Sequence, residues 1–203
     1  TLALGSAKYT EIKDLKNIDI IAVPELYYSY LGFKVGKWNT ETLEVNTDME
    51  NSKVGDPKLR QAMAYALNVE EVTEVFYDGL RERANAIIPP VVSSFHDASL
   101  EGYTYDEAKA ISILDEAGYK DVDGDGFREN KNGEKLQIKL ATMSGDDIAE
   151  QIAAFWLQNW KAVGLNVVLT DGRTIDFNSF YDRVEADDPE IDMELYDLDG
   201  HAT

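Results

Sequence analysis

Apolar and aromatic residues near the start of the chain come in two short runs. Residues 18–26 (IDIIAVPEL) and 27–33 (YYSYLGF) are rich in branched and aromatic side chains, and Pro24 separates them. These runs predict two strands, or one strand bent at the proline. The polar stretch from residue 37 to residue 55 predicts a loop.

Helical spacing begins at Asp56. This residue is suited to cap a helix whose first position is Pro57, and apolar residues follow at helical intervals. Asn68 and Glu71 then form a capping-box pattern, and Gly79 ends the second helix. Two helices are therefore predicted between residues 56 and 79.

The second half of the chain alternates helical and strand patterns. Thr104 begins a helix that Gly118 ends, and residues 136–140 alternate apolar and polar side chains. Ser144 is predicted to cap a long helix, and residues 165–169 form the next strand. Strand, helix and strand with short joints predict a βαβ unit with parallel pairing and a right-handed crossover.

The last elements complete an α/β pattern. Residues 174–184 predict a short helix, and residues 191–198 predict a final strand. The chain starts at Thr1 without an initiator methionine and stops directly after that strand. We therefore expect a piece of a longer protein.

Composition narrows the function classes. The 203 residues include no cysteine, 39 acidic and 19 basic side chains, for a net charge of −20. Without cysteine there is no disulfide or zinc–thiolate site. The negative charge argues against nucleic-acid partners, because phosphate binding needs clustered lysine and arginine. No apolar run approaches the roughly 18 residues of a membrane span.

An acidic glycine-rich segment, DVDGDGFRE at residues 121–129, begins as a calcium loop does. The candidate metal ligands are four carboxylates and one main-chain carbonyl, at Asp121, Asp123, Asp125, Phe127 and Glu129. Gly126 stands where such loops turn, but Asn132 replaces the expected bidentate glutamate. Two interpretations stay open: a Ca²⁺ site, or a tight Asp/Gly turn whose side chains bond their own backbone.

Catalytic patterns are nearly absent. There is no GxSxG motif, and His96 and His201 lie in polar surroundings that indicate solvated side chains. The acidic run of residues 182–192 includes Asp187 and Glu190, which suit paired-carboxylate glycoside hydrolysis. Such runs are more often solvated surfaces. No catalytic residue is therefore predicted.

Three ordered motifs carry a family resemblance. They are YSYLGFK at residues 28–34, DPKLRQAMAYALNVEEV at residues 56–72, and EAGYKDVDGDGFRENKNGEKLQIKL at residues 116–140. In this order and spacing the chain resembles the extracytoplasmic solute-binding proteins of ABC importers, family 5, the oligopeptide- and dipeptide-binding group.

The resemblance implies a fold and a role. The fold is α/β, a periplasmic-binding-protein-like (type II) lobe with a mixed sheet flanked by helices. Residues 1–26 would be a crossing strand that connects two lobes, and residues 27–203 an incomplete C-terminal ligand-binding lobe without its N-terminal partner. Family members capture oligopeptides in the inter-lobe cleft and deliver them to a membrane permease. They are not enzymes and need no cofactor, and they are periplasmic or cell-surface lipoproteins.

The resemblance also implies where a ligand binds. The final strand leads into the cleft segment, which places the ligand-binding residues at Tyr196, Leu198, Asp199 and Gly200. Leu198 stands where the family has a tryptophan, and Lys34 stands where an asparagine is common. Peptide, nickel, haem or sugar ligands therefore stay open. The alternatives outside the family are a calcium-stabilised surface or adhesion module and a carboxylate-dependent hydrolase.

Overall fold

The computed structural model describes residues 8–23, 26–145 and 148–199. The chain divides into two compact units that each combine distant segments. The first unit comprises residues 1–28, 68–103 and 197–203, and the second unit comprises residues 29–67 and 104–196.

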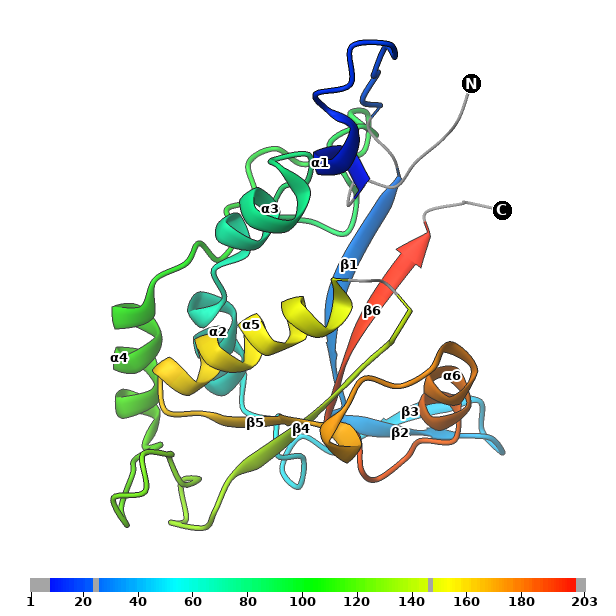
Figure 1. Ribbon diagram of the computed structural model, residues 1–203. Helices are drawn as coiled ribbons and strands as arrows, with labels where there is room; N and C mark the ends of the chain where they lie inside the picture. Colours follow the sequence, from blue (N-terminus) through cyan, green and yellow to red (C-terminus); the bar gives the residue numbers. More distant parts are fainter. Residues whose placement is uncertain (1–7, 24–25, 146–147, 200–203) are drawn as a thin grey trace. The chain divides into compact units, whose positions relative to one another are not determined.

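A four-stranded sheet has the order β1-β6-β4-β5 (Figure 1). Its strands are β1 (Tyr27–Phe33), β4 (Gln137–Thr142), β5 (Asn166–Leu169) and β6 (Met193–Asp199). β4 pairs in parallel with both β5 and β6, with Leu140 opposite Leu169 on one side and opposite Met193 on the other. β1 runs opposite to β6 in Figure 1, so the sheet is mixed, as predicted.

Four helices belong to the second unit: α2 (Pro57–Ala66), α4 (Glu107–Ala117), α5 (Ala149–Ala162) and α6 (Phe177–Glu185). α5 joins β4 to β5, which confirms the predicted βαβ unit. The indole of Trp160 on α5 is fully buried, and its Nε1–H donates to the carbonyl oxygen of Met63 on α2 at 3.1 Å. Because a buried indole N–H needs a partner, this bond fixes how α5 packs against α2.

The first unit contains the short helix α1 (Tyr9–Ile12) and α3 (Val69–Tyr77). Asn68 caps α3 by accepting a hydrogen bond from the Glu71 N–H, as the capping-box pattern predicts. The guanidinium of Arg81 lies 4.0 Å from the ring centroid of Tyr77.

Among the described residues, no helix is long and apolar enough to cross a membrane.

The prediction of a strand at residues 18–26 is wrong for residues 18–23, which form no strand. Ile21 in this segment is 82% exposed. A branched apolar run becomes a strand only where another strand pairs with it, and no strand in the described part of the chain pairs with residues 18–23.

The predicted loop at residues 37–55 contains a hairpin of β2 (Gly36–Asn39) and β3 (Glu44–Thr47), paired antiparallel. Its side chains are mostly exposed, so it lacks the apolar alternation that would have predicted it. The turn has a local cause, because the Asn39 side chain accepts hydrogen bonds from the N–H groups of Glu41 and Thr42.

Two predicted helix caps are wrong. Asp106, rather than Thr104, caps α4 by accepting from the Lys109 N–H. Ser144 does not cap α5, because α5 begins at Ala149 and Ile148 stands at its N-cap position; the Ser144 N–H donates to the carbonyl oxygen of Ile175. That bond extends the parallel pairing beyond β4, so the chain is still extended where a helix was predicted to begin.

Candidate functional site

The predicted ligand-binding residues lie at the end of β6. The backbone of Tyr196, Leu198 and Asp199 is part of that strand, their side chains are not described, and Gly200 lies outside the described residues. β4 runs parallel to β6, so the carboxyl ends of both strands point the same way. Ligands of open α/β sheets bind beyond this edge. The assignment of these four residues stays a prediction.

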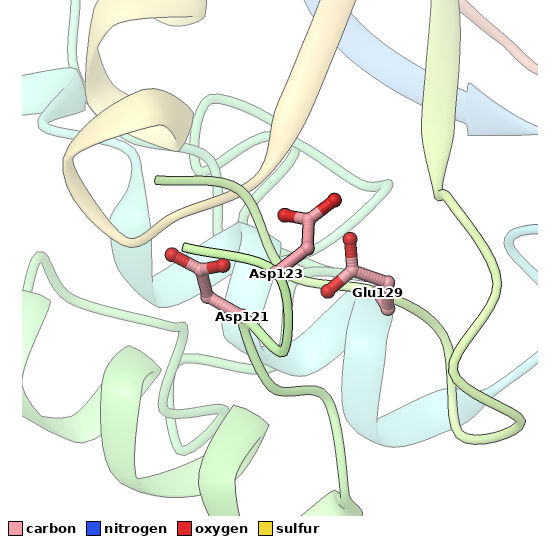
Figure 2. Close-up of side chains that lie close together, drawn as sticks. All are labelled: Asp121, Asp123 and Glu129. Atoms are coloured by element: carbon pink, nitrogen blue, oxygen red, sulfur yellow. The ribbon is translucent and has the colours of Figure 1, made fainter. Parts of the chain in front are cut away.

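The acidic glycine loop brings three of the five predicted metal ligands together (Figure 2). Carboxylate oxygens of Asp121, Asp123 and Glu129 lie within 4.8 Å of one another. Glu129 is only 2% exposed and accepts a hydrogen bond from the Val122 N–H. One buried and two exposed carboxylates offer the oxygen ligands that a Ca²⁺ site uses.

The same loop also satisfies its own backbone. The N–H groups of Gly124 and Gly126 donate to Asp121 at 2.7 and 2.9 Å, and the Phe127 N–H donates to Asp125 at 2.8 Å. Gly124 and Gly126 have φ values of +79° and +92°, which side-chain-bearing residues rarely adopt. The geometry thus contains the features of both interpretations, a tight Asp/Gly turn and a carboxylate cluster.

Lys135 follows this loop, and its role there was not predicted from the sequence. Its ammonium forms ion pairs with Asp123 and Asp125 and lies 3.5 Å from Glu129. Hydrogen bonds to Asp123 and Asp125 raise the pKa of Lys135 above its ordinary value. A tethered ammonium therefore supplies positive charge at the carboxylates that a Ca²⁺ ion would bind. Glu129 and Lys135 form an antiparallel bridge where the chain turns back. Their short separation in the sequence was the signal that could have predicted this contact.

Arg128 joins the loop to the ends of two helices. Its Nε–H donates to the carbonyl oxygen of Val163 at 2.8 Å, and Nη1 donates to the carbonyl oxygen of Tyr119 at 2.7 Å and to Asp115 at 2.5 Å. Its backbone N–H donates to the carbonyl oxygen of Gly164. The RE pair at the end of the loop thus has a structural role, with Arg128 facing the helix ends and Glu129 facing the acidic cluster.

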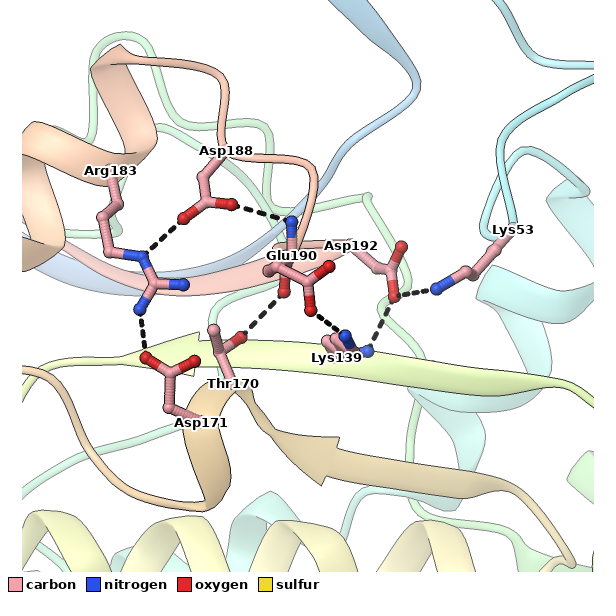
Figure 3. Close-up of polar contacts among 8 residues, drawn as sticks. All are labelled: Lys53, Lys139, Thr170, Asp171, Arg183, Asp188, Glu190 and Asp192. Atoms are coloured by element: carbon pink, nitrogen blue, oxygen red, sulfur yellow. Dashed lines mark hydrogen bonds and ion pairs between the residues drawn. The ribbon is translucent and has the colours of Figure 1, made fainter.

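The acidic run at residues 182–192 is held by basic side chains (Figure 3). Asp188 pairs with Arg183, Glu190 pairs with Lys139, and Asp192 accepts from Lys53 at 2.9 Å and from the Lys139 N–H at 2.8 Å. The Glu190 N–H and the Arg183 guanidinium hold the pKa of Asp188 below its ordinary value. Of the two carboxylates considered for hydrolysis, Asp187 pairs with Lys34 and Glu190 pairs with Lys139, so this geometry favours a structural network over the hydrolase alternative.

The fold defines the class of protein: an α/β lobe of a type II periplasmic-binding protein, which confirms the predicted fold class. Residues 2–198 match the bacterial extracellular solute-binding proteins, family 5 (middle region), and the chain belongs to this family. This confirms the resemblance seen in the sequence. The family is one of substrate-binding transport proteins rather than enzymes.

Individual relatives agree. The chain is 34% identical to the oligopeptide-binding protein OppA of Lactococcus lactis subsp. lactis over 193 residues, which is 95% of this chain and 32% of that protein. Lactococcal OppA with an endogenous peptide, in the closed conformation, superposes with a TM-score of 0.87 at 32% identity, covering 97% of this chain and 37% of that one. Bacillus subtilis AppA with a nonapeptide gives a TM-score of 0.75 at 25% identity, covering 97% and 36%. The chain thus spans about a third of the length of these relatives.

Proposed function

We propose that this chain is part of the substrate-binding component of an ABC importer that captures extracellular oligopeptides and delivers them to a membrane permease. The observation that carries the proposal is the match of nearly the whole chain to lactococcal OppA, a structure that holds a peptide. In this role the protein binds and releases its ligand without breaking bonds. Its location is extracytoplasmic, as a periplasmic protein or a lipid-anchored one at the cell surface.

The chain offers one part of such a binding site. Contacts from the rest of the relatives' length, and the exclusion of water by closure, would be missing for this segment alone. We therefore expect a dissociation constant no better than about 0.1 mM, which corresponds to roughly −5.5 kcal/mol. Main-chain hydrogen bonds at a strand end accept many sequences, so a mixture of peptides is the right ligand.

The test is a titration of the isotopically labelled chain with mixed tetra- to octapeptides, followed by NMR. We expect small saturable shifts centred on residues 196–200. The matching mixture of amino acids should leave these signals unchanged. No shift at millimolar peptide, or shifts confined to other residues, would contradict the proposal. Mass spectrometry of the recovered peptides should show no cleavage.

Calcium binding at the acidic glycine loop is a separate prediction that peptide capture does not require. Three carboxylates converge there, and Lys135 competes for them. A calcium-stabilised module would require a strong dependence of folding on Ca²⁺. The ammonium of Lys135 instead favours a loop that folds without the ion and gains little from it.

A further inference from the structure

The proposed function does not make use of a pocket in the second unit. Its volume is about 230 Å³, and it lies among the end of β1, the strand β2 and the segment that leads from α6 into β6. Its walls include Gly32, Lys34, Trp38, Asp187, Ile191 and Glu194. Drug-sized ligands occupy pockets from about 300 Å³ upwards, so this space suits a single side chain.

Glu194 supplies an unneutralised carboxylate to the pocket. It is partly buried, and it forms no hydrogen bond or ion pair with any residue that the structure describes. Burial raises the pKa of its carboxyl, and the Lys34 ammonium works against that rise. A Cβ atom on Gly32 would come within 2.9 Å of Glu194 Oε1, so the glycine makes the room that this carboxylate occupies.

Lys34 does not neutralise Glu194, because its three donors are used elsewhere. The ammonium donates to the carbonyl oxygens of Asp187 and Asp188 at 2.9 and 2.8 Å, and it pairs with Asp187 Oδ1 at 2.6 Å. The lysine therefore fixes the bend before β6 and cancels the charge of Asp187. Negative charge at Glu194 remains available to a ligand.

Trp38 adds an aromatic wall. It is 56% exposed, whereas Trp156 and Trp160 are buried. An indole face attracts cations, and the aliphatic stem of a long side chain covers apolar surface while its charged end reaches polar groups. Ile191 lies in the same pocket and would contact such a stem.

We propose that this pocket binds a guanidinium or ammonium group on an aliphatic stem, as in arginine or lysine, with its cationic end at Glu194 and its stem against Trp38. A divalent metal fits less well, since among residues 8–23, 26–145 and 148–199 the acidic glycine loop is where three ligating side chains converge. The pocket precedes the predicted peptide segment along β6. Its lining residues do not include residues 196–200, so the proposal can be tested separately from peptide capture.

Titration with the amide of N-acetyl-arginine tests the proposal, with the amide of N-acetyl-citrulline as its uncharged match. Trp38 is the exposed indole, so its fluorescence reports binding, and NMR gives a second readout. We expect saturable binding of the arginine compound and at least about tenfold weaker binding of citrulline. Free arginine, the blocked arginine and an arginine-containing tetrapeptide should bind about equally, because the side chain is recognised. Equal binding of citrulline would overturn the proposal.

Two variants locate the site. Glu194→Gln should weaken arginine binding about tenfold, while Glu50→Gln, which removes a carboxylate from an exposed turn, should change nothing. Trp38→Leu should abolish the fluorescence response and weaken the binding seen by NMR about threefold. Melting curves serve as the control that each variant is folded. If arginine affinity is unchanged in both Glu194→Gln and Trp38→Leu, the ligand binds elsewhere and the inference is wrong.

Discussion

Replacing Arg128 by methionine removes a guanidinium that joins three segments while keeping most of the aliphatic stem. The side chain is 14% exposed and donates to the carbonyl oxygens of Val163 and Tyr119 and to the carboxylate of Asp115. These acceptors lie at the end of α5, in the segment after α4 and in the last turn of α4. The variant therefore tests whether the loop is held by these bonds or by the packing around it.

The cost follows from the acceptors that lose their donor. Each of the two carbonyl groups left without a partner costs about 1–3 kcal/mol. Asp115 is 57% exposed, so its ion pair with Arg128 is screened and adds little. Water reaching part of the site offsets some of this cost. We expect a loss of about 2–4 kcal/mol, which lowers the melting temperature of a chain of this size by about 5–12 °C.

Urea unfolding followed by the near-ultraviolet signal of the buried tryptophans is a suitable assay, because Trp160 lies close to Val163 in the sequence. Arg173→Met is the matched control, since Arg173 is exposed and has no side-chain bond to any described residue. The control should stay within about 0.5 kcal/mol of the parent chain. If Arg128→Met does the same, the carbonyl bonds do not stabilise the loop and the reasoning fails.

Three further predictions use the other charged groups. Lys135→Met should unmask the carboxylate cluster, so that about 1 mM Ca²⁺ raises the melting temperature of the variant by roughly 3–6 °C and that of the parent chain by less; if neither protein responds, the calcium prediction is wrong. Asp56→Ala should cost about 1–2 kcal/mol at pH 7, because Asp56 caps α2 and contacts Lys131 and Tyr119. Burial acts to raise the pKa of Asp56, but these partners outweigh burial and lower the pKa. The stabilisation by Asp56 is therefore present above the ordinary pKa of 3.8 and is lost as the pH falls further. A stability difference between variant and parent chain that does not shrink in acid would count against this prediction. The folded chain holds the Glu194 proton more tightly than the unfolded chain, so stability should fall as the pH rises from 4.5, and Glu194→Gln should raise the melting temperature at pH 7 but not near pH 4.

Periodic segments were predictable from the sequence because the spacing of apolar residues within each segment determines whether it forms a helix or a strand. The βαβ unit from residue 136 to residue 169 has apolar spacing that changes from strand to helix and back, and the structure places β4, α5 and β5 there. Asp56 and Asn68 were identified as helix caps because capping bonds are local. Both depend on residues within a few positions of one another.

The missed features depend on partners far along the chain. Residues 18–23 have strand composition but no paired strand, whereas the polar hairpin β2–β3 forms because its two halves pair with each other. In the acidic run, the ion-pair partners of the carboxylates come from distant parts of the chain: Asp192 pairs with Lys53, and Asp187 pairs with Lys34. No periodicity in the sequence reports such a contact. The pocket with Glu194 and Trp38 was missed for the same reason.

One of the motifs that carry the family resemblance is also one that the structure explains without a ligand. In residues 116–140, Gly118 ends α4 in a left-handed conformation, Arg128 joins the helix ends, and Glu129 and Lys135 close the acidic loop. A segment that needs a left-handed glycine, an arginine at the helix ends and this glutamate–lysine contact identifies the fold, because few other side chains would make these interactions. It does not report what the protein binds, since the predicted ligand residues lie elsewhere, at the end of β6. Ligand identity must therefore be measured at two places. One is residues 196–200, where Leu198 departs from the family pattern, and the other is Glu194, for which the sequence predicted no role.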